Sequence, residues 1–177
     1  MRQRLALVVV GGVAGSGLFW LVQVMTGGPT ITAFMGEQVA AAGGYPATLA
    51  PAFGWIIHVA VGLSYASLFG VVVAPLRLLP RAALAGTSLV MAIVFGWLTT
   101  AIAPSAISVT VGLLGHRRWP AEIFPLNWDV GLPFWNHQLF FLANWIMQVL
   151  GGMVVRARAR SRRRSLITGR EGQGERE

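Results

Sequence analysis

The side chains best suited to chemistry in this chain are its three histidines, His58, His116 and His137. Near neutral pH an imidazole can carry a proton, bind a metal ion or hold a ligand by a hydrogen bond. The chain has no cysteine, which excludes thiol nucleophiles, thiolate metal sites and disulfides. It also lacks a Gly-x-Ser-x-Gly elbow, a phosphate-binding loop, paired carboxylates and a His-Glu-x-x-His element. These absences predict that the protein is not an enzyme.

His58 stands out because it lies within an apolar stretch, at a depth shared by other uncharged polar residues. At about 1.5 Å per helical residue, Gln23, His58, Thr99 and Asn144 all fall within about 10 Å of one boundary of these stretches. Gln148 lies one turn beyond Asn144 on the same helix face. We therefore predict a ligand-binding cluster of Gln23, His58, Thr99, Asn144 and Gln148. The alternative for His58 is a neutral ring that hydrogen-bonds to a neighbouring helix.

Haem and metal ions are the cofactors that histidines of a helical protein would bind. His137 begins its apolar stretch whereas His58 lies roughly two turns deeper, which argues against haem between them. The loop before His137 also contains His116, Glu122 and Asp129, but not at the close spacing of a metal site. No cofactor and no metal centre are predicted. The loop, rich in tryptophan and proline, is expected to form a lid over the outer ends of the helices.

The composition indicates what surrounds these residues. Of 177 residues, 55% are hydrophobic and only 11% are charged, whereas a soluble domain carries about 25% charged residues. All basic residues are arginine, and they lie at the ends of apolar segments. The net charge of +8 therefore indicates orientation in a membrane rather than nucleic-acid binding.

The predicted fold is an all-α integral membrane protein in which four transmembrane helices form an antiparallel bundle. A bilayer core of roughly 30 Å takes about 20 helical residues, and four stretches have this length. They cover residues 5–25, 51–74, 82–103 and 137–155. The single transmembrane domain spans residues 1–160, and its outer loop is expected to contain short interfacial segments. Residues 161–177, rich in Arg, Gly and Glu, are expected to form a mobile cytoplasmic tail.

Arginine and tryptophan predict the orientation. Arginines flank one set of helix ends and recur after the last stretch, whereas Arg117 and Arg118 lie on the opposite side. The positive-inside rule then puts both termini in the cytoplasm of a bacterial-type inner membrane, with anionic headgroups near the arginine-rich tail. Tryptophans fall toward the predicted outer face, where amphipathic rings favour the headgroup level. They are Trp20, Trp55, Trp97, Trp119, Trp128 and Trp135.

Small residues recur at helical spacing and are expected to let the helices approach closely. They repeat every four residues in the first and second stretches and recur near the inner end of the last. In lipid, such faces and shared hydrogen bonds replace hydrophobic burial as the basis of helix association. The predicted packing positions are Gly11, Gly15, Gly62, Ala66, Gly70 and Gly151.

Several short motifs carry a family resemblance. They are the glycine-rich first stretch, Gly54-Trp55-Ile56-Ile57-His58 followed by Gly62 and Ala66, Leu84-Ala85-Gly86, and Leu132-Pro133-Phe134-Trp135. Over most of residues 5–160 the chain resembles the YagU-like inner-membrane proteins, small four-helix families of unknown function. The resemblance implies fold and location but no reaction. Similar proteins tend to carry a second histidine in the last helix, often after an acidic residue, where this chain has Asn144 and Phe141, so only His58 is carried over.

Two functions remain open from the sequence. Abundant packing motifs without a catalytic constellation favour an accessory or scaffold subunit that contacts a membrane-protein partner or further copies of this chain. The alternative is a protein that handles a small molecule, lipid or ion, as a channel or transporter does, through an outward-facing polar cluster around His58. A cavity lined by that cluster would favour the second function.

Overall fold

The computed structural model describes residues 2–154 and 157, and this part of the chain contains helices and no strands. Three of the described helices are long and apolar enough to cross a membrane: α1, α3 with its flanking turns, and α4. The all-α class is confirmed, and these three helices agree with a membrane protein. The predicted tail, residues 161–177, lies outside the described residues. The elements in order are α1 (Arg2–Met25), α2 (Ile31–Gly43), η1 (Ala47–Leu49), α3 (Ala50–Val73), η2 (Pro75–Leu78), α4 (Arg81–Leu114), α5 (Leu132–Trp145) and η3 (Ile146–Leu150).

The last apolar stretch becomes helical earlier than expected. α5 begins at Leu132 rather than at residue 137, with Pro133 in its first turn, where the fixed φ and missing N–H of proline suit a helix start. The backbone stays helical to residue 154 and passes through one wider π turn, η3. α5 has only 14 residues. To reach across a bilayer core of roughly 30 Å it would need this continuation.

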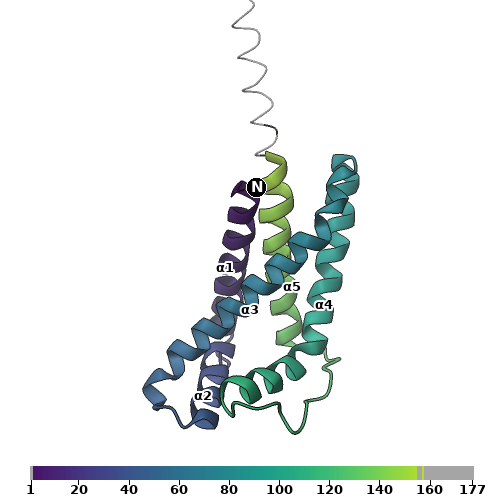
Figure 1. Ribbon diagram of the computed structural model, residues 1–177. Helices are drawn as coiled ribbons and strands as arrows, with labels where there is room; N and C mark the ends of the chain where they lie inside the picture. The colour runs from purple at the N-terminus through teal and green to yellow at the C-terminus, as the bar shows by residue number, and fades with distance from the viewer. Residues whose placement is uncertain (1, 155–156, 158–177) are drawn as a thin grey trace, which may run out of the picture.

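α1, α5 and α4 lie side by side, and neighbours among them run in opposite directions, while α3 crosses in front of them obliquely and packs mainly on α1 (Figure 1). Gly62 of α3 lies against Ser16 of α1, and Gly15 of α1 lies against Phe140 of α5. α3 and α4 are joined by the tight turn η2 but otherwise contact each other little. The predicted four-helix bundle is therefore not confirmed, because α3 runs obliquely and lies apart from α4 along most of its length.

A helix occupies much of residues 27–50, which lie between the first two predicted spans. Thr30 caps the start of α2 by accepting a hydrogen bond from the Ala33 N–H at 3.2 Å. Gly44 ends the helix with a φ of 65°, a left-handed conformation that glycine adopts without strain. The sequence did not reveal this helix because α2, with 13 residues, is too short to be recognised as a membrane span.

α2 packs on the start of α3 with closely apposed backbones. A Cβ atom added to Gly36 would overlap the carbonyl oxygen of Ala50, and one added to Gly54 would overlap the carbonyl oxygen of Thr32. Both obstacles are backbone atoms, which cannot rotate away. Only glycine fits at these two positions, so they determine how closely α2 lies on α3.

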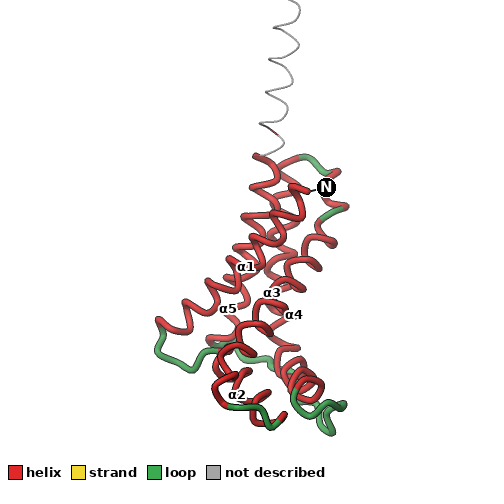
Figure 2. The backbone as a smooth tube through the Cα atoms, turned by 60° about the vertical axis from the view of Figure 1, so that its left-hand side comes forward, coloured by secondary structure: helices red, strands yellow, loops and turns green. Residues whose placement is uncertain are grey.

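α4 continues to Leu114, although the sequence predicted an end at Pro104. A proline inside a helix removes a backbone donor and crowds the preceding turn, so it bends the helix without necessarily ending it. Figure 1 shows the second part of α4 turning to run across the end of the other helices. The Asn127 N–H donates to the carbonyl oxygen of Ala101 at 2.9 Å, which supplies a partner at the bend. In Figure 2, α2 and the loop after α4 lie at the end of the molecule away from the start of α1, whereas the connection between α3 and α4 lies near that start.

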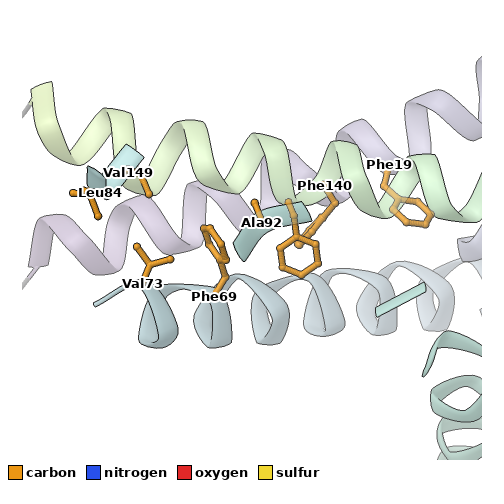
Figure 3. Close-up of a cluster of buried hydrophobic side chains, with 8 residues drawn as sticks. Phe19, Phe69, Val73, Leu84, Ala92, Phe140 and Val149 are labelled. Carbon is orange, nitrogen blue, oxygen red and sulfur yellow. The ribbon is translucent and has the colours of Figure 1, made fainter. Parts of the chain in front are cut away.

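A row of buried apolar side chains runs along the middle of the helices (Figure 3). Phe69 and Phe141 are fully buried, and their ring centroids lie 5.9 Å apart at an angle of 65°, an edge-to-face geometry that aromatic pairs favour. Many large apolar side chains elsewhere are exposed, as expected of helices that face lipid. The buried cluster consists of Phe19, Phe69, Val73, Leu84, Ala92, Phe140, Phe141 and Val149.

Candidate functional site

A cavity of about 320 Å³ lies between the helices, with walls from α1 to α5 and from the loop after α4. Its volume is at the lower end of the range of ligand pockets, roughly 300–1,000 Å³. Most of its lining is apolar, which is the usual composition of pockets that bind small molecules. The polar side chains in its wall are Ser16, Gln23, His58, Tyr65, Thr110, Asn127 and His137.

His58 lines the cavity from α3 and is also bonded to α1. Its Nε2 lies 3.0 Å from the carbonyl oxygen of Ser16. Because a carbonyl oxygen only accepts hydrogen bonds, Nε2 carries the proton of the neutral ring and donates it. Nδ1 is then an acceptor, and no described residue donates to it. His58 therefore joins two helices and still has one ring nitrogen free for a ligand.

His137 lines the same cavity from α5, although the sequence placed it at a different depth from His58. Its Nδ1 lies 2.7 Å from the carbonyl oxygen of Pro133, so Nδ1 donates and Nε2 is the acceptor. The ring of Phe19 contacts both imidazoles, with centroids 5.4 Å from His58 and 5.2 Å from His137. The depth estimate failed because α5 begins before His137 and because α3 runs obliquely across the other helices (Figure 1).

Ser16 also lines the cavity, and the sequence did not single it out as a site. The residue is only 1% exposed, and its Oγ has no hydrogen-bond partner among the described residues. Gly62 makes room for it, because a Cβ atom there would overlap this Oγ. The spacing of seven residues to Gln23 put both on one face of α1, but only the approach of α3 shows that Ser16 faces a cavity.

The five predicted ligand-binding residues do not form one cluster. Gln23 and His58 line the cavity. The Oε1 atom of Gln23 accepts a hydrogen bond from the Ile31 N–H at 2.9 Å, so this amide is used to hold the start of α2. Thr99, buried elsewhere on α4, donates its hydroxyl hydrogen to the carbonyl oxygen of Phe95 at 2.7 Å.

Asn144 and Gln148 form a separate pair of buried amides. Gln148 Nε2 donates to the carbonyl oxygen of Ala66 at 2.9 Å and lies 3.2 Å from Asn144 Oδ1. Asn144 Nδ2 donates to the carbonyl oxygen of Phe140 at 3.0 Å. The bond to Ala66 holds the last helix against α3, and neither amide lines the cavity. Equal depth therefore did not bring all of the predicted polar residues together.

The predicted packing glycines lie against side chains of the same chain. A Cβ atom on Gly11 would approach Asn144 Oδ1 to 2.7 Å, and one on Gly70 would approach Gln148 Oε1 to 2.7 Å. Ala66 is fully buried. Gly15 and Gly62 face Phe140 and Ser16, as described above, while Gly151 has more room, with Leu7 Cδ2 at 3.5 Å from such a Cβ atom. These small residues accommodate neighbouring polar and aromatic side chains.

Hydrogen bonds hold the loop after α4 against that helix beside the bend at Pro104. Ser105 Oγ donates to the carbonyl oxygen of Phe124 at 2.8 Å, and the Phe124 N–H donates to Ser108 Oγ at 3.0 Å. Phe124 and Asn127 both line the cavity. This part of the loop thus covers one side of the cavity. Within the described residues, no three His, Cys, Asp or Glu side chains gather in a group that could hold a metal ion.

No family model, no curated protein and no solved structure matches this chain. The resemblance to YagU-like proteins remains a prediction from its motifs, and the geometry of the cavity is the basis for assigning a function.

Proposed function

We propose that this protein binds a small apolar or amphipathic molecule within the membrane, in the cavity between its helices. The observation that carries the proposal is the cavity itself. It combines an apolar wall with the imidazoles of His58 and His137 and the hydroxyl of Ser16. A polar group in an apolar environment costs free energy unless it is hydrogen-bonded, and a bound ligand would supply the missing partners.

The accessory or scaffold function draws less support from the arrangement of the chain. It was predicted from small-residue faces, and Gly11, Gly15, Gly62 and Gly70 are used in contacts between the chain's own helices. A partner would have to bind another surface. We therefore rank ligand binding first and keep partner binding as the alternative.

We also propose that the chain crosses the membrane four times, with the helical stretch from residue 132 to residue 154 as the fourth crossing. The start of α1, the turn η2 and the end of this stretch lie at one end of the molecule (Figure 1). Arginines occur in or beside the first two of these segments and follow the third. By the positive-inside rule, this end faces the cytoplasm of a bacterial-type inner membrane.

Paired tryptophans support the position of the opposite boundary. Trp20 and Trp55 have ring centroids 5.4 Å apart, and Trp97 and Trp128 lie 5.1 Å apart. Such rings prefer the headgroup level of a bilayer. The cavity would then open near the outer leaflet, beneath the loop after α4.

A cavity-filling substitution tests the function. Ile107 lines the cavity, whereas Ile102 lies on the same helix, exposed and outside the cavity wall. Ile107→Trp is expected to abolish binding of a fluorescent lipophilic probe to the purified protein, and Ile102→Trp is expected to leave it unchanged. Equal probe binding by both variants and the natural protein would refute ligand binding in this cavity.

A further inference from the structure

The two imidazoles of the cavity both present a hydrogen-bond acceptor. His58 Nε2 and His137 Nδ1 each face a backbone carbonyl oxygen, at 3.0 Å and 2.7 Å. Each of these nitrogens must therefore carry the proton of its neutral ring. The remaining nitrogens, His58 Nδ1 and His137 Nε2, are lone-pair acceptors to which no described residue donates.

The cavity wall provides no charge to bind an ion. Every described residue that lines it is uncharged when the two histidines are neutral. A carboxylate or phosphate would meet two lone pairs and lose its hydration without an opposite charge in return. A metal ion would find two nitrogen ligands but no third ligand among the histidine, cysteine and acidic side chains described. A neutral ligand with a hydrogen to donate is what these nitrogens can accommodate.

Ser16 can donate a hydrogen bond, whereas the free imidazole nitrogens can only accept one. Its Oγ is buried and unpartnered among the described residues, so its hydrogen becomes available to a ligand once a rotation of the side chain turns the hydroxyl toward the cavity. A ligand hydroxyl is a donor and an acceptor at once. It could donate to an imidazole nitrogen and accept from Ser16, while the apolar wall from Ile57, Val61 and Phe140 takes up the hydrocarbon.

We propose that the cavity binds neutral amphiphiles through a hydroxyl group, in preference to fatty acids, ethers and plain hydrocarbons. This inference rests on the proposed function, since it names the ligand class of the same cavity. The cavity is expected to discriminate between these ligands because one without a hydrogen-bond donor leaves the buried polar groups of the site unpaired.

Four probes of equal chain length separate the possibilities: decanol, methyl decyl ether, decanoate and decane. Their binding to the purified protein is measured by displacement of a fluorescent lipophilic probe. The Ile107→Trp variant in the same detergent corrects for partition of each probe into micelles. We expect decanol to bind about tenfold more tightly than the ether, which keeps the oxygen but loses the donor.

Substitutions then test where in the cavity the hydroxyl group of the ligand binds. Ser16→Ala removes a group that has no partner within the described protein, so folding should be preserved while the preference for decanol falls several-fold. Ser64→Ala is the matched control, because this exposed serine of α3 bonds only within its own helix. Binding of the ether or decane as tight as that of decanol, a preference for decanoate, or an unchanged preference in Ser16→Ala would overturn the ligand class. If the corrected binding of all four probes were zero, the proposed function itself would fail.

Discussion

His58 of α3 donates a hydrogen bond through Nε2 to the carbonyl oxygen of Ser16 of α1, at 3.0 Å. The bond crosses between two helices that approach closely because Gly62 leaves space for the Ser16 side chain. It lies at the wall of the cavity, so it sets the orientation of the imidazole that a ligand would meet. Helix packing and the proposed ligand binding therefore share one residue.

Removing this bond should weaken the protein measurably. We expect His58→Leu to lower the free energy of unfolding by about 1 kcal/mol, the usual net contribution of a hydrogen bond between helices. Unfolding in mixed detergent micelles, followed by circular dichroism, measures the change. His116→Leu is the control, because His116 is exposed and lies outside the cavity wall. Equal stability of the two variants would show that the bond contributes nothing.

The contact between α2 and α3 should tolerate no side chain at Gly54. We expect Gly54→Ala to destabilise the protein by about 3 kcal/mol or more, since the new Cβ atom would overlap a backbone carbonyl. Gly86→Ala is the matched control on α4, where nothing lies within 4 Å of a Cβ atom. That variant should be neutral or stabilised by up to about 1 kcal/mol through better helix propensity. Thermal unfolding of the two variants gives the comparison, and equal melting temperatures would contradict the close contact.

The loop after α4 should loosen when Ser108 loses its hydroxyl. Ser108 Oγ accepts the hydrogen bond of the Phe124 N–H. We expect Ser108→Ala to speed hydrogen exchange at Phe124 and proteolysis within residues 115–131, while exchange in α1 and α3 stays unchanged. Ser64→Ala serves as a control with no contact to this loop. Unaltered exchange at Phe124 would mean that the bond does not hold the loop in place.

Thiol labelling tests the proposed topology without background, because the chain has no cysteine. Leu78 is 92% exposed in η2, and Asp129 is exposed in the loop after α4. We expect a membrane-impermeant reagent to label Asp129→Cys in intact cells and Leu78→Cys only after permeabilisation. Labelling of both residues from outside would reject the single crossing by α4 between them and the orientation proposed here.

Much of the fold could be predicted from composition and length, because a bilayer imposes simple requirements on both. Apolar runs of sufficient length became the helices α1, α3 and α4, with starts close to the predicted positions. Proline was harder to interpret. Pro51 and Pro133 lie near helix starts. Pro104 lies inside a helix, at a bend beside which a loop N–H donates to the Ala101 carbonyl oxygen.

The residue types available to the site were a property of the sequence: uncharged polar groups in apolar helices, no cysteine and few acidic residues. Which of them meet was decided only by the tertiary structure. His137 lies in the same cavity as His58, whereas Asn144 and Gln148 contact each other. The oblique path of α3 and the early start of α5 changed the depth of these residues and the direction in which their side chains point. Position along a chain measures depth only for helices that run parallel to one another, and an interhelical cavity belongs to no single helix.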